Sequence, residues 1–102
     1  MKLRLLAEAE AEIESARRYL NRQARELGTR FLDDLDLTLL DILERPASFS
    51  KLETLPDDEP YQRALLRIFR YAVIFEIHAD EILIVAVVHT SRRPNYWLNR
   101  RK

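Results

Sequence analysis

The fold is decided by the stretch from Arg67 to Arg101, which reads RIFRYAVIFEIHADEILIVAVVHTSRRPNYWLNRR. Two apolar runs, Arg67–His78 and Ile82–His89, predict two β-strands joined by a short turn at residues 79–81. Every residue from Ile82 to Val88 is apolar, which is typical of a central strand that is covered on both faces. A basic tail follows the second strand. We therefore expect a sheet that ends in a cationic segment.

Two helices are predicted before this stretch, because apolar residues recur there at helical spacing. The first helix has Ala9, Ile13, Ala16 and Leu20 on one face, and the second has Gly28, Phe31, Leu35, Leu39 and Ile42. The connection between them falls between Gln23 and Gly28. Pro46 ends the second helix, since proline lacks an amide donor and disfavours a helical residue before it. A helical hairpin is the simplest interpretation.

The acidic residues of both helices are expected on their solvent faces. They run from Glu8 to Glu14 in the first helix and from Asp33 to Asp41 in the second. Such runs resemble metal-binding clusters, but their spacing scatters the carboxylates along exposed surface. We predict solvation, and neither a metal site nor a cofactor site.

Further strands are expected on both sides of the helical hairpin. Lys2–Leu6 alternates charged and apolar residues, as a half-buried strand does. Ala47–Pro60 is irregular, and Tyr61–Phe69 is another strand candidate, with a turn or a bulge near residues 69–71. The sequence thus predicts a single α+β domain over residues 1–102. Its N-terminal strand and antiparallel helical hairpin pack on a small, mainly antiparallel β-sheet with a short basic C-terminal tail.

The composition argues against a disulfide-rich protein, a thiolate metal site and a membrane-spanning protein. The chain has no cysteine, which argues against a disulfide framework or a thiolate metal site, and no apolar run reaches the roughly 18–20 residues of a membrane span. We expect a cytoplasmic protein. Its net charge is zero, but residues 1–60 hold 9 Lys/Arg and 14 Asp/Glu, whereas residues 61–102 hold 8 and 3. The basic end either meets an acidic partner or is a solvated tail.

The tail carries a recognisable pattern. Residues 89–100 read HTSRRPNYWLNR, that is, H-x-x-R-R-P-x-Y-W-x-x-R, and residues 69–75 read FRYAVIF. Together with the order of elements, these motifs resemble the RelE/ParE family of bacterial toxins. The resemblance implies a toxin of a type II toxin–antitoxin module, with a role such as plasmid stabilization. It also implies a hetero-oligomer in which a cognate, ParD-like antitoxin covers an open strand edge or an apolar face of the toxin.

The family has two functional branches. ParE-like members poison DNA gyrase by binding, and RelE-like members cut mRNA on the ribosome. The long helical hairpin and the R-R-P-x-Y-W tail favour the ParE-like branch. Ala72 stands where the ribonuclease branch has an arginine, which also argues against RNA cleavage. The alternatives are a RelE-like endonuclease and an inactive member that only binds its antitoxin.

Candidate site residues follow from these alternatives. For contact with a target or partner they are Arg92, Arg93, Tyr96, Trp97, Arg100 and Arg101. For a nuclease, the residues of suitable chemistry are His89, Arg92, Arg93, Tyr96 and Arg67, if Arg67 lies nearby on the sheet. His89 could instead cap its strand through hydrogen bonds. Tyr96 and Trp97 either close the core or anchor an interface.

Overall fold

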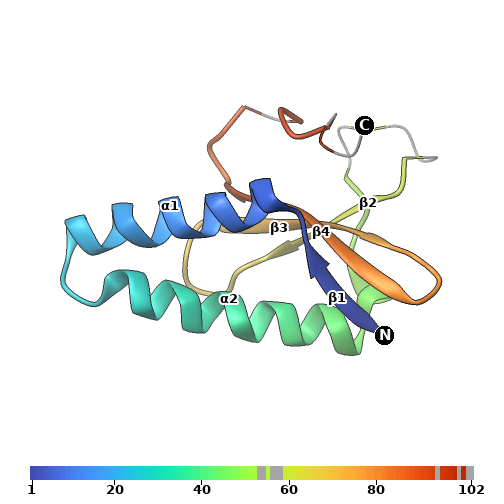
Figure 1. Ribbon diagram of the computed structural model, residues 1–102, viewed down its shortest axis with the longest axis horizontal. Coiled ribbons are helices and arrows are strands. Elements are labelled where there is room, and N and C mark those ends of the chain that lie inside the picture. Colours follow the sequence, from blue (N-terminus) through green and yellow to red (C-terminus); the bar gives the residue numbers. More distant parts are fainter. Residues whose placement is uncertain (53–54, 56–58, 94, 99, 101–102) are drawn as a thin grey trace.

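Two helices lie along one face of a four-stranded sheet in the computed structural model, which describes residues 1–52, 55, 59–93, 95–98 and 100 (Figure 1). The elements in order are β1 (Lys2–Leu5), α1 (Ala7–Gln23), α2 (Leu27–Glu44), the short 3-10 helix η1 (Pro46–Ser48), β2 (Tyr61–Leu65), β3 (Tyr71–Ile77) and β4 (Glu81–His89). The strand order is β1-β4-β3-β2. Only the β1–β4 pair is parallel, so the predicted α+β class and mainly antiparallel sheet are confirmed.

Two cores cover the two faces of the sheet, as predicted for the apolar β4. The helix-facing core contains Phe31 and Ile42 of α2 with Phe75, Ile82 and Ile84 of the strands, all fully buried. The opposite core is smaller and packs Tyr61, Ile74 and Val85 against Trp97 of the C-terminal tail. The tail therefore forms part of the folded domain. No helix in the described part of the chain is long and apolar enough to span a membrane.

The helical hairpin closes at the predicted place. Gly28 of α2 approaches α1 so closely that an added Cβ would lie 2.5 Å from the backbone oxygen of Arg17. The amide of Gly28 donates to the side-chain oxygen of Asn21 at 2.8 Å, which ties the start of α2 to the end of α1. Glycine is needed here for close helix packing, since any side chain would force the helices apart.

Two of the predicted strands have the wrong bounds. β2 ends at Leu65 and β3 begins only at Tyr71, so the strands expected over Arg67–His78 and Tyr61–Phe69 are each too long. Residues 66–70 form the turn between them, with the Leu66 amide donating to the Tyr71 carbonyl at 3.0 Å. The turn predicted near residues 69–71 is therefore confirmed, and the register shift lies elsewhere. It falls between Ile74 and Phe75 on β3, where Val85 is the extra residue on β4.

Asp34 explains why the turn forms, and it corrects the prediction that the acids of α2 are solvated. The Asp34 side chain is only 2% exposed. Its carboxylate accepts hydrogen bonds from the amides of Arg67 at 3.2 Å, Ile68 at 2.9 Å and Phe69 at 3.0 Å. Three amides that a strand would have used are therefore satisfied by a side chain, which bends the backbone into a turn.

Candidate functional site

The candidate site lies where β4 extends beyond its neighbour β1. β1 pairs only with residues Glu81–Ile84, whereas β4 continues to His89. The backbone N–H and C=O groups on an unpaired strand edge need other hydrogen-bond partners. Two side chains bond to this edge: the Val87 amide donates to Glu12 Oε1 at 3.0 Å, and Arg100 donates to the Val85 carbonyl at 3.1 Å.

Glu12 and Arg100 also bind each other, and we call them the Glu12–Arg100 pair. The guanidinium donates to Glu12 Oε1 at 2.7 Å and to Oε2 at 2.8 Å, a bidentate arrangement. Both side chains are largely buried, at 18% and 15% exposed. The expectation that the acids of α1 are all solvated is thus wrong for Glu12, which joins α1 to the C-terminal tail. The pair also raises the pKa of Arg100, chiefly through the hydrogen bond to Glu12.

Tyr96 completes this contact. Its hydroxyl donates to Glu12 Oε2, and its ring lies under two guanidinium groups, that of Arg92 at 4.5 Å and that of Arg100 at 5.2 Å from the ring centre. Burial, together with the hydrogen bond to the Glu12 carboxylate, raises the pKa of Tyr96 to about 12. Tyr96 therefore remains a neutral donor at physiological pH.

Trp97, unlike Tyr96, does not bond to α1 but lies in the smaller core on the opposite face of the sheet. It is 3% exposed and packs edge-on against Tyr61, with ring centres 4.8 Å apart. Of the two roles considered for the aromatic residues of the tail, Trp97 has the packing role. Of the described candidate contact residues, Arg92 and Arg93 are exposed, whereas Tyr96 and Arg100 are partly buried.

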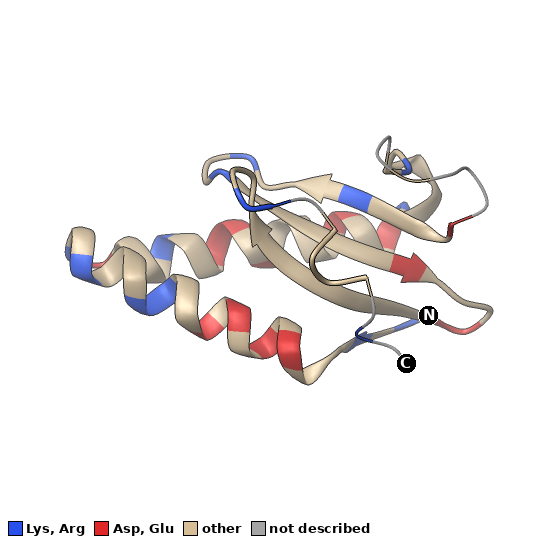
Figure 2. Ribbon diagram, turned by 90° about the horizontal axis from the view of Figure 1, so that it is seen from above, with Lys and Arg blue, Asp and Glu red and all other residues tan. Residues whose placement is uncertain are grey.

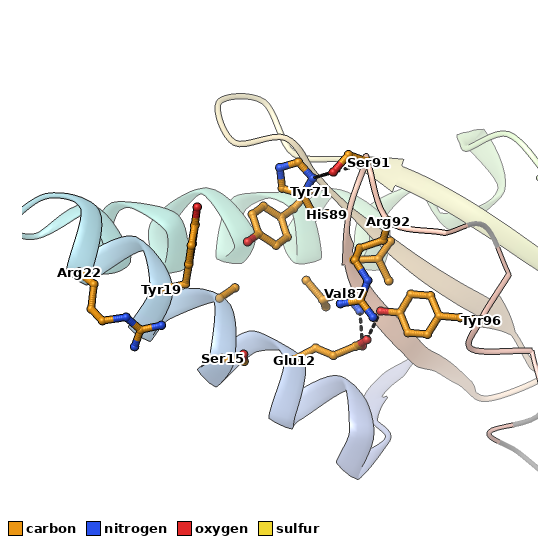
Figure 3. Close-up of a pocket in the computed structure, with 12 residues that line it drawn as sticks. Glu12, Ser15, Tyr19, Arg22, Tyr71, Val87, His89, Ser91, Arg92 and Tyr96 are labelled. Atoms are coloured by element: carbon orange, nitrogen blue, oxygen red, sulfur yellow. Dashed lines mark hydrogen bonds between the residues drawn. The ribbon is translucent and has the colours of Figure 1, made fainter.

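The tail and α1 enclose a groove of about 460 Å³ beside the free edge of β4 (Figure 3). We call it the α1 groove. Its lining includes Tyr19 and Arg22 of α1, Tyr71 of β3 and Arg92 of the tail, with Glu12 and Tyr96 at one end. A second, smaller hollow of about 210 Å³ lies on the opposite face of the sheet, where Ala72 and Ile74 meet Arg63 and Arg93.

His89 stands between the two hollows. Its Nδ1 accepts a hydrogen bond from the Ser91 amide at 3.1 Å, and the Ser91 hydroxyl lies 2.7 Å from the same nitrogen. Its ring packs edge-on against Tyr71 at 5.1 Å. These contacts end β4 and shape the following turn, as the capping role predicts. They also occupy Nδ1 of the ring, so this nitrogen cannot act as a general base while the contact with Ser91 is in place.

The structure brings together most, but not all, of the predicted site residues. His89, Arg92 and Tyr96 line both hollows, and Arg93 lines the second. Arg67 does not join them. It lies in the β2–β3 turn rather than on the sheet, and its guanidinium binds Asp41 of α2 at 2.8 Å. Arg101 lies outside the described residues. No cluster of three or more metal-ligating side chains occurs in the described part of the chain.

Known proteins resemble this chain in sequence pattern and in fold. A family model for the ParE toxin of the type II toxin–antitoxin system parDE matches residues 3–94. A solved structure titled as a chromosomal ParDE toxin–antitoxin system from P. aeruginosa superposes with a TM-score of 0.74. The aligned region covers 87% of this chain and 95% of that one, at 12% identity, so the likeness is one of fold. No curated protein matches the chain.

Proposed function

The chain belongs to the ParE toxin family of type II toxin–antitoxin systems, and from this membership we propose that it inhibits DNA gyrase by binding and that a ParD-like antitoxin neutralises it. Membership in a toxin–antitoxin family implies an antitoxin partner. The identity of the target, the ParD-like nature of the partner and a cytoplasmic site of action are parts of the proposal.

The observation that carries the proposal is the way in which the tail is held. A poison that acts by binding needs a rigid contact surface rather than an aligned set of reacting groups. The Glu12–Arg100 pair fixes the tail against α1, and Arg92 is thereby presented on the Tyr96 ring at 4.5 Å. Arginine and tyrosine on a preorganised surface are the residue types that dominate protein interfaces. We assign target contact to Arg92, Arg93 and Tyr96.

RNA cleavage is the second candidate, and the smaller hollow is the observation in its favour. Arg63, His89, Arg92 and Arg93 line it, which gives cations for a phosphate. However, Ala72 lies on its wall, 2% exposed, at the position where the ribonuclease branch has an arginine. His89 is committed to Ser91. Among the described residues, the hollow thus has no arginine at the position of Ala72, and Nδ1 of His89 already accepts a hydrogen bond.

Two assays on the purified protein separate the candidates. In the first, gyrase and supercoiled plasmid are incubated with the toxin, and in the second, mRNA-loaded ribosomes replace them. The proposal predicts cleaved plasmid trapped on gyrase and intact mRNA. Cut mRNA with normal supercoiling would refute it in favour of the nuclease. Neither effect, from a protein that still binds its antitoxin, would indicate an inactive member.

A further inference from the structure

The α1 groove is positively charged despite the glutamate at its end. Arg22 and Arg92 both line it and both are exposed, while the carboxylate of Glu12 is neutralised by Arg100. Within the described residues, neither Arg22 nor Arg92 has a carboxylate at ion-pair distance. Figure 2 shows that α1 is acidic in its first half and basic toward its end, where Arg22 lies. The groove is therefore suited to an anion.

Three tyrosines also line this groove. Two of them are held in place: Tyr71 packs against Phe31 at 4.9 Å and against His89 at 5.1 Å, and Tyr96 is fixed by Glu12. Tyr19 is different, because 51% of it is exposed. Its side chain rises from α1 toward the hydroxyl of Tyr71 in Figure 3. An exposed aromatic ring beside a fixed one provides a surface on which a flat ring can stack.

The α1 groove is less suited to an amphipathic peptide helix than to a flat ring that carries an anionic group. Such a helix inserts large apolar anchors into an aliphatic groove. The aliphatic side chains that line the α1 groove are small, namely Ala16, Val87 and Val88. Its volume of about 460 Å³ lies within the range of pockets that hold small molecules. Aromatic surface with two uncompensated guanidinium groups matches a planar base joined to a phosphate.

We propose that the α1 groove binds an unpaired nucleotide, with its base stacked on Tyr19 beside Tyr71 and its phosphate at Arg22, which lies on the same helix as Tyr19 (Figure 3). Arg92 and Tyr96, assigned above to target contact, line the other end of the groove, but the two residues that would hold the nucleotide, Tyr19 and Arg22, belong to α1 and not to the tail. The nucleotide belongs to a single strand of DNA or RNA, or it is free. The three sources share one chemistry, so the experiment must distinguish them.

Binding is measured by fluorescence anisotropy with three labelled probes, namely short strands of oligo-dT and oligo-U and AMP, and unlabelled AMP serves as a competitor. The proposal predicts saturable, salt-dependent binding of at least one of the three probes. Tyr19→Ala should weaken it about 5-fold or more, the minimum expected when one base loses its aromatic platform, whereas Tyr19→Phe should retain it. Arg22→Gln should lower the slope of log K against log salt by about 1.

Arg30→Gln is the matched control, because Arg30 is exposed on α2 and does not line the groove. Circular dichroism of each variant establishes that it is folded. Displacement of the strand by AMP would assign the site to a nucleotide unit, and binding of one strand alone would assign the source. The proposal is overturned if no probe binds, if Tyr19→Ala and Arg22→Gln bind like Arg30→Gln, or if an acidic peptide binds more tightly and competes. None of these outcomes depends on whether gyrase is the target.

Discussion

Two carboxylates, one on each helix, organise two different regions of this molecule. Asp34 of α2 is 2% exposed and accepts three backbone amides of the β2–β3 turn. Glu12 of α1 is 18% exposed and binds one backbone amide, the Tyr96 hydroxyl and the Arg100 guanidinium. Both were expected to be solvated. One shapes a turn within the sheet, and the other holds the tail that carries the proposed target contacts.

The two carboxylates differ in the groups that stabilise their negative charge. No cation pairs with Asp34 among the described residues, so its charge is stabilised by oriented amides of the fold itself. Glu12 depends on a cation near the end of the chain. Removing one carboxylate therefore leaves Arg100 partly buried without its partner, whereas the donors around Asp34 are part of the backbone itself. The turn should therefore be a fixed part of the fold, while the contact between the tail and α1 should depend on Glu12.

The largest effect is expected for Asp34→Ala. The substitution leaves three amides without their acceptor, and each unsatisfied buried donor is costly, so we expect a loss of about 3–5 kcal/mol in the free energy of unfolding. Urea denaturation followed by circular dichroism measures it. Asp33→Ala, at an exposed neighbouring position, should change stability little. Equal stability of the two variants would show that the turn does not depend on Asp34.

A smaller effect with a local readout is expected for Glu12→Gln. Loss of the carboxylate leaves Arg100 partly buried without its partner, which should cost about 1–3 kcal/mol after allowance for its exposure. Trp97 is the single tryptophan of the chain and is buried in the tail. Its emission should therefore shift to the red in Glu12→Gln. Glu14→Gln on the exposed side of α1 is the control. An unshifted emission in Glu12→Gln would contradict the assigned role of the pair.

The smallest effect is expected for Tyr96→Phe, which removes one hydrogen bond to Glu12 and should cost about 0.5–1.5 kcal/mol. The pKa of Tyr96 in the folded protein, about 12, lies above the value of about 10 for an unfolded tyrosine. Its contribution to stability is thus complete below pH 10 and is lost as the pH rises through 12. Burial also raises the pKa of Tyr71, so absorbance titration should show late-titrating tyrosines in the wild type and one fewer of them in Tyr96→Phe. The same titration curve in both proteins would refute the contact.

The sequence predicts much of the fold because periodicity reports burial. The apolar residues of β4 and both helix faces lie where their spacing placed them. Glu12 and Asp34 were missed, although each is spaced for the core side of its helix. Glu12 follows Ala9 by three positions, and Asp34 follows Phe31 by three. The sequence did not reveal the groups that these carboxylates bind. The free edge of β4 exists only in the assembled sheet, and the amides that bind Asp34 were expected to lie in strands.

The most direct test of the account is the gyrase assay performed with wild type, Glu12→Gln and Glu14→Gln side by side. The account predicts that the wild type and Glu14→Gln trap cleaved plasmid on gyrase, and that Glu12→Gln, still folded but with a released tail, traps much less. Trapping by Glu12→Gln at the wild-type level, with its Trp97 emission shifted to the red, would contradict the claim that the held tail makes the contact. So would a wild-type protein that leaves gyrase unaffected.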